Sequence, residues 1–166
     1  MTMTDTPEGT PKSKEIPQSD LSKYVTSDAQ VQLNVLTPAI IEKVELRESM
    51  NPPKKDSQGK EYATVFLAFK FKLDPPIENL SECVSNFSIR RYDENGLNRL
   101  WFGTEKSGTR KLMDLIQNSL GVNKDASIVE ILNVLQGKKV SLKSEQVHDP
   151  NKNEQVWKVF IKAFRL

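Results

Sequence analysis

An Asn95-Gly96 pair constrains the fold of this chain most, because Asn-Gly is the preferred sequence of a two-residue β-hairpin turn. Such a turn fixes which residues face each other across the two strands. The facing pairs are Tyr92 with Arg99 and Arg90 with Trp101. The opposite face carries the apolar residues Ile89, Leu100 and Phe102. The sequence therefore predicts a hairpin with one face toward a core and one face of guanidinium and aromatic groups.

Residues 61–73 alternate apolar and polar side chains with the period of two that is typical of a half-buried β-strand. One side consists of large apolar residues that we expect in the core, Val65, Leu67, Phe69, Phe71 and Leu73. The other side carries Phe66, Lys70 and Lys72. Because Pro75-Pro76 lacks backbone donors, we expect it to end the strand.

Further strands are predicted on both sides of this region. Residues 31–36 and 39–47 form two alternating stretches that fit one strand bent at Pro38. The hairpin strands extend over 84–92 and 97–102, and two last strands, 138–147 and 155–164, surround a turn-rich segment.

Two stretches with helical spacing separate the hairpin from the last strands. The first ends at Gly121, a favourable residue after a helix, and either Ser107 or Thr109 opens it. In the second, Ser127 precedes Glu130 by the spacing of a capping box. We expect both helices to cover the core with their apolar stripes.

The length of 166 residues suits one domain and a tail. Residues 1–29 are rich in Thr, Pro, Ser and charged residues without apolar periodicity, so we expect a disordered N-terminal arm. Residues 30–166 are expected to form the single folded domain. Within it, residues 48–60 are predicted to be a long exposed loop that carries Lys54 and Lys55.

Composition narrows the class of protein. The formal net charge is only +2, so a basic surface has to come from the placement of lysines and arginines. No apolar run is long enough to cross a bilayer and the N-terminus is polar, so we expect an intracellular, cytoplasmic protein without membrane segment or signal peptide. Cys83 is the single cysteine, which excludes an intrachain disulfide.

The sequence offers little catalytic chemistry. Residues 103–108 have the glycine spacing of a phosphate-binding loop, but Thr109-Arg110 stand where that loop needs Lys and Ser or Thr. His148 is the single histidine and lies in a polar turn, without a recognisable metal or nucleophile partner. The acidic residues lack the spacing of a metal-binding cluster. We therefore expect no enzyme activity, no cofactor, no metal and no small-molecule substrate.

The predicted order is three strands with a hairpin on the third, a helix pair, and two more strands. Over residues 31–166 this resembles, in architecture, the OB-fold single-strand-binding proteins, including small replication proteins of phages and other viruses. The expected fold class is therefore mainly β, an OB-like barrel of five strands plus an extra hairpin, with the helix pair between strands three and four. The resemblance implies a binding groove across the second and third strands, flanked by the loop between the first two strands and the loop between the last two.

Carried onto the matching strands and loops, the resemblance implies a groove of Phe66, Lys70, Lys72, Arg90, Tyr92, Arg99 and Trp101, with walls at Lys54, Lys55 and Lys152. The implied partner is single-stranded nucleic acid, DNA more readily than RNA, bound without catalysis in replication or recombination. Aromatic rings would stack on bases while lysines and arginines neutralise phosphates, which gives little sequence preference.

A second interpretation is a protein-interaction or viral assembly module built on a β-barrel or sandwich, because fold does not fix function. A homo-oligomer is compatible with both interpretations. The face that carries Arg90 and Trp101 separates them: it lines an open groove in the first, and is covered by a partner or closed by its own stacking in the second. On the last strand, Lys158, Phe160 and Lys162 share a face that we expect to be solvated or to form an interface.

Overall fold

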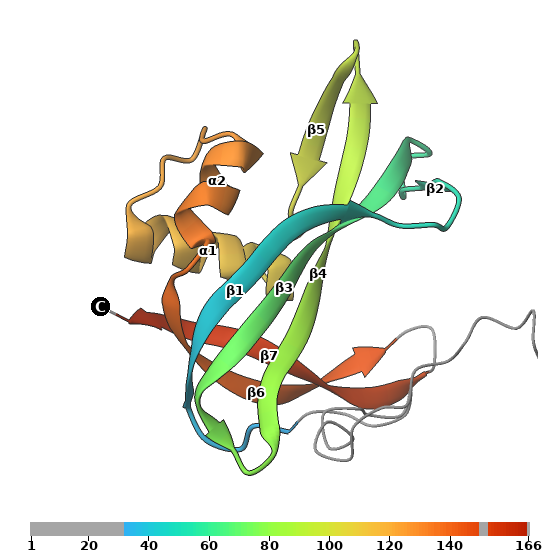
Figure 1. The fold of residues 1–166 in the computed structure, drawn as a ribbon. Coiled ribbons are helices and arrows are strands. Elements are labelled where there is room, and N and C mark those ends of the chain that lie inside the picture. Colours follow the sequence, from blue (N-terminus) through green and yellow to red (C-terminus); the bar gives the residue numbers. More distant parts are fainter. Residues whose placement is uncertain (1–31, 150–152, 166) are drawn as a thin grey trace, which may run out of the picture.

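The computed structural model describes residues 32–149 and 153–165, and it is mainly β (Figure 1). The expected N-terminal arm and Lys152 lie outside these residues. The described strands are β1 (Thr37–Glu48), β2 (Lys54–Lys55), β3 (Glu61–Ile77), β4 (Leu80–Glu94), β5 (Leu97–Trp101), β6 (Lys139–Asp149) and β7 (Glu154–Arg165). Two helices, α1 (Gly108–Leu120) and α2 (Ile128–Leu135), lie between β5 and β6. The expected helix pair ahead of the last two strands is thus confirmed.

The strands form one antiparallel path in the order β5-β4-β3-β1-β6-β7, and β2 pairs with the start of β3. In Figure 1, β6 and β7 cross β1, β3 and β4 at a steep angle, while the β4–β5 hairpin projects from the opposite end. Backbone pairing among the described strands does not join β4 to β7. These two strands meet through a buried side-chain bond, in which Ser85 Oγ donates to the carbonyl of Val159 at 2.7 Å. The closed barrel therefore stays a prediction.

The Asn95-Gly96 turn produces the register that its sequence predicts. Both turn residues have positive φ, 57° and 82°, as a tight hairpin turn requires. Arg90 pairs with Trp101 and Tyr92 with Arg99. On the other face Ile89 is buried, and Leu100 and Phe102 pack against the core.

Strand β3 alternates as expected but is longer than the sequence indicates. Val65, Leu67, Phe69, Phe71 and Leu73 are all buried. The strand continues through Pro75-Pro76 to Ile77. The prolines fit because the register between β3 and β4 is irregular between Lys72 and Ile77, so no regular ladder bond is needed from them.

The first strand begins later than predicted, at Thr37. The segment before it still contributes to the core, because Leu33 is buried and is held on both sides by one residue of β6. The amide of Leu33 donates to Ser144 Oγ at 2.7 Å, and the amide of Ser144 donates to the carbonyl of Leu33 at 3.0 Å.

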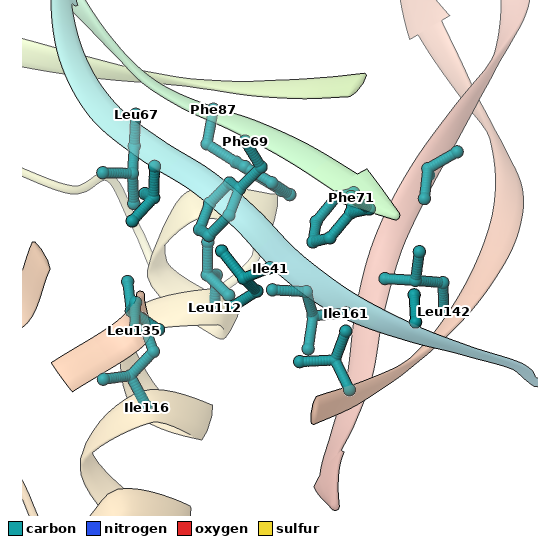
Figure 2. Packing of buried hydrophobic residues seen from close by; sticks show 14 of the residues in the cluster. Ile41, Leu67, Phe69, Phe71, Phe87, Leu112, Ile116, Leu135, Leu142 and Ile161 are labelled. Atoms are coloured by element: carbon teal, nitrogen blue, oxygen red, sulfur yellow. The ribbon is translucent and has the colours of Figure 1, made fainter. Parts of the chain in front are cut away.

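Of the two candidates Ser107 and Thr109, Ser107 caps the start of α1, and the predicted Ser127 caps the start of α2. Ser107 accepts from the amide of Arg110 at 3.0 Å, and Gly121 ends α1 in the left-handed conformation. Ser127 accepts from the amide of Glu130 at 3.2 Å. Figure 2 shows the helix side chains meeting those of the strands in one core, which includes Phe69, Phe87, Leu112, Ile116, Leu135, Leu142 and Ile161.

Candidate nucleic-acid interface

A groove of about 650 Å³ lies where β3, β4, the end of β5 and the start of α1 meet β7 and the loop after β1. None of the described residues that line it is acidic. Its aromatic lining consists of Tyr62, Phe66, Trp101, Phe102 and Phe160. Its cationic lining consists of Lys54, Arg90 and Lys158. In a chain with 22 acidic and 24 basic residues, this lining is a strong local enrichment of flat apolar rings and positive charge.

The groove forms because β5 pairs only with the last part of β4, from Arg90 to Glu94, and leaves the rest of that edge of β4 uncovered by β5. The last β4–β5 pair is Arg90 with Trp101, after which Gly103 turns the chain toward α1. A Cβ on Gly103 would lie 2.4 Å from Ser107 Oγ, and its φ is 101°, so this turn requires glycine. Beyond the turn, Thr109 Oγ1 donates to the carbonyl of Ser88 at 2.9 Å and fixes the start of α1 against the uncovered part of β4.

Arg90 is the fixed centre of one wall. Its guanidinium lies between two rings, 4.4 Å from the centroid of Tyr62 and 4.7 Å from that of Trp101. It also donates to the hydroxyl of Tyr92 at 3.3 Å, and this hydrogen bond raises the pKa of Arg90. Trp101 itself remains 40% exposed, so part of its indole ring is accessible to a ligand. The structure thus combines an aromatic–cation stack with an accessible ring.

The loop after β1 is tied to this wall through Asp56. The hydroxyl of Tyr92 donates to Asp56 Oδ2 at 2.9 Å, while the amides of Lys60 and Gln58 donate to Oδ1 at 2.8 and 2.9 Å. These bonds, that from Lys60 first, lower the pKa of Asp56. Short strand β2 then places Lys54 directly opposite Tyr62. The wall predicted at Lys54 therefore lines the groove, while the neighbouring Lys55 is exposed outside the lining.

Two of the predicted hairpin residues lie on the expected face but outside the groove lining. The hydroxyl of Tyr92 is hydrogen-bonded to Asp56, and its ring packs against that of Tyr62, with the two centroids 5.8 Å apart. Arg99 Nε donates to Glu94 Oε1 at 2.6 Å. Glu94 also accepts from Lys60, and both bonds, that from Lys60 first, lower the pKa of its carboxyl. At the hairpin tip, both cations are therefore already paired with one carboxylate.

On β3 the predicted residues divide in the same way. Phe66 lines the groove. Lys70 lies between Glu82 at 3.4 Å and Glu42 at 3.5 Å, and its pKa is raised by these carboxylates, Glu82 first. Lys72 is exposed farther along the strand and does not line the groove.

Strand β7 supplies groove residues that the sequence interpretation assigned to a solvated or interface surface. Lys158 Nζ lies 4.2 Å from the ring centroid of Phe87 and 5.7 Å from that of Phe160. Burial lowers the pKa of Lys158 to about 8. The alternation of Lys158, Phe160 and Lys162 was visible in the sequence, but nothing in it distinguished the lysine in the groove from the lysine outside it.

Other chemistry is limited in the part of the chain that the structure describes. His148 is exposed, and no cluster of three or more His, Cys, Asp or Glu side chains could hold a metal ion within residues 32–149 and 153–165. Neither described helix is long and apolar enough to cross a membrane. No protein-family model and no curated protein matches the chain.

Proposed function

We propose that the groove binds single-stranded nucleic acid, DNA in particular, without catalysis and with little sequence preference. The observation that carries this proposal is the groove lining, with five aromatic residues, three cations and no acidic residue among those described. Flat rings stack on bases of any sequence, and cations neutralise phosphates and release counterions. Such binding suits a cytoplasmic role in coating or protecting strands during replication or recombination.

The proposal includes an OB-like barrel. The groove crosses β3 and β4, which are the second and third long strands, and its walls come from the loop after β1 and from β6 and β7. This is the location of the binding face in OB folds. The bond between Ser85 and Val159 joins β4 to β7, the two strands whose approach would complete such a barrel.

The interaction-module alternative has its own support. The guanidinium of Arg90 already contacts two rings of this chain, those of Tyr62 and Trp101, as in a closed surface stack. Val84 and Leu97 are 66% and 71% exposed on β4 and β5, where a protein partner would bury them. A test of nucleic-acid binding separates the two functions.

The test is tryptophan fluorescence of a Trp157→Phe variant, in which Trp101 is the remaining tryptophan. We expect titration with oligothymidylate to quench Trp101, and the affinity to fall between about 50 and about 200 mM salt. In an anisotropy assay with labelled oligothymidylate, Trp101→Ala is expected to weaken binding about 5- to 150-fold, since one base stack contributes about 1–3 kcal/mol. Trp157→Phe is the matched control and is expected to bind as the wild type does. Absence of binding at low salt contradicts the proposal and favours the interaction module.

A further inference from the structure

The cations of this protein are unevenly neutralised. Arg99 and Lys60 share Glu94 at the hairpin tip, and Lys70 lies between Glu42 and Glu82. A phosphate that approached any of these groups would compete with a carboxylate already in place. The hairpin tip and the outer part of β3 therefore offer little net attraction to a polyanion.

Lys158 differs from these residues. Among the described residues, no carboxylate lies within 4.0 Å of its Nζ. Glu145 is directly across from Lys158 on β6, but its carboxylate binds Lys162. The ammonium of Lys158 is instead half-buried against the rings of Phe87 and Phe160. A desolvated cation without a counterion is unfavourable, and a bound phosphate would relieve it.

The surroundings of Lys158 are continuous with the aromatic wall. Phe160 packs against the start of α1 so closely that a Cβ on Gly108 would lie 3.0 Å from its ring. Gly108, Phe102 and Trp101 all line the same groove. Rings therefore extend from the β5 end of the groove to the β7 side, where the unneutralised ammonium lies.

We infer that the bound nucleic acid follows the part of the groove between β4 and β7, which we call the seam and which Arg90, Lys158 and Phe160 line. One base would stack on Trp101 and one backbone phosphate would contact Lys158 Nζ. The nucleic acid would not follow the β4–β5 hairpin. This inference rests on the proposed function and specifies its ligand path. It makes Lys158 a phosphate-binding residue and leaves Arg99 outside the site.

The test compares Lys158→Gln with two charge-matched controls outside the groove lining, Lys72→Gln and Arg99→Gln, in the full chain with labelled oligothymidylate. One phosphate contact contributes about 0.7 to the slope of log affinity against log salt on a single strand. Loss of that contact should weaken binding about fivefold at 0.1 M salt and flatten the slope by about 0.7. We expect both controls to stay within about twofold of the wild type. Lys158→Arg, which keeps the charge, should retain most of the affinity and guards against a folding defect in Lys158→Gln.

The outcomes separate this inference from the proposed function. If the wild type binds but Lys158→Gln binds equally well, or Arg99→Gln loses as much affinity, the path along the seam is wrong while the function stands. If the wild type does not bind oligothymidylate at low salt, the proposed function itself fails. Ultraviolet crosslinking to oligothymidylate gives a second measurement: adducts on Phe160 support the seam, and adducts confined to Tyr92 overturn it.

Discussion

Raising the pH from about 7 to about 9 is expected to weaken binding about threefold through Lys158. Burial lowers the pKa of Lys158 to about 8, so the free protein loses most of this charge across the interval. A phosphate contact that strengthens binding about fivefold raises the pKa of Lys158 in the complex by about 0.7. By linkage the contact then strengthens binding about 4.7-fold at pH 7 but about 1.4-fold at pH 9. An ordinary lysine, which titrates near 10.4, would produce almost no change.

The direction of this pH dependence follows from the pKa of Lys158 in the free protein and from its higher pKa in the complex. The contact is present below the pKa of free Lys158 and is lost as the pH rises through the pKa of the bound side chain. Among the described residues, the other ionisable side chains that line the groove are Lys54, Arg90 and Tyr62, and Glu145 on β6 is engaged by Lys162.

The assay is fluorescence anisotropy with a labelled oligodeoxyadenylate, whose bases stay neutral over this range, at constant ionic strength. Lys158→Arg is the control, because a guanidinium keeps its charge at both pH values and should give a flat profile. A flat profile in the wild type would refute the role of Lys158. An equal decrease in Lys158→Arg would show that another group titrates.

Two further predictions concern the framework of the groove. Gly103→Ala should weaken oligothymidylate binding in the anisotropy assay, because the added Cβ would lie 2.4 Å from Ser107 Oγ. Gly59→Ala is the control, since Gly59 also has a positive φ, 80°, but has nothing within 4 Å of an added Cβ. This variant carries the backbone strain alone and should bind normally. Phe87→Ala should lower the free energy of unfolding by about 3–5 kcal/mol in urea denaturation, since the ring is fully buried. Val84→Ala on the same strand is the exposed control, with an expected change within about 0.5 kcal/mol; a similar loss in both variants would contradict this account.

Local signals in the sequence determined the elements that form from neighbouring residues. Asn95-Gly96 set the hairpin register, and Ser127 set the start of α2, because turn and cap geometry depend on a few adjacent positions. The extent of β3 was not predictable in this way. It depends on an irregular register with β4, which accommodates Pro75-Pro76.

The sequence predicted which side chains of the candidate site share one face of the sheet. It did not predict which of the lysines are neutralised by carboxylates. The alternation of β3 and of the hairpin predicts that Phe66, Arg90 and Trp101 share one face, and all three line the groove. Which lysines are neutralised depends on carboxylates from distant segments, such as Glu42 beside Lys70. The position of Lys158 depends on how β7 crosses β4, which no residue pattern within one strand encodes.

The arrangement around Arg90 has a consequence for the thermodynamics of ligand capture. An arginine that is mobile before association loses rotamer freedom when it closes on a ligand, at a cost of about 0.5–1.5 kcal/mol. Here the rings of Tyr62 and Trp101 hold the guanidinium in advance, and Tyr92, which accepts a hydrogen bond from Arg90, is itself held by Asp56. That ordering is completed during folding, so a ligand that contacts this wall is expected to immobilise less side-chain freedom than it would at a mobile arginine.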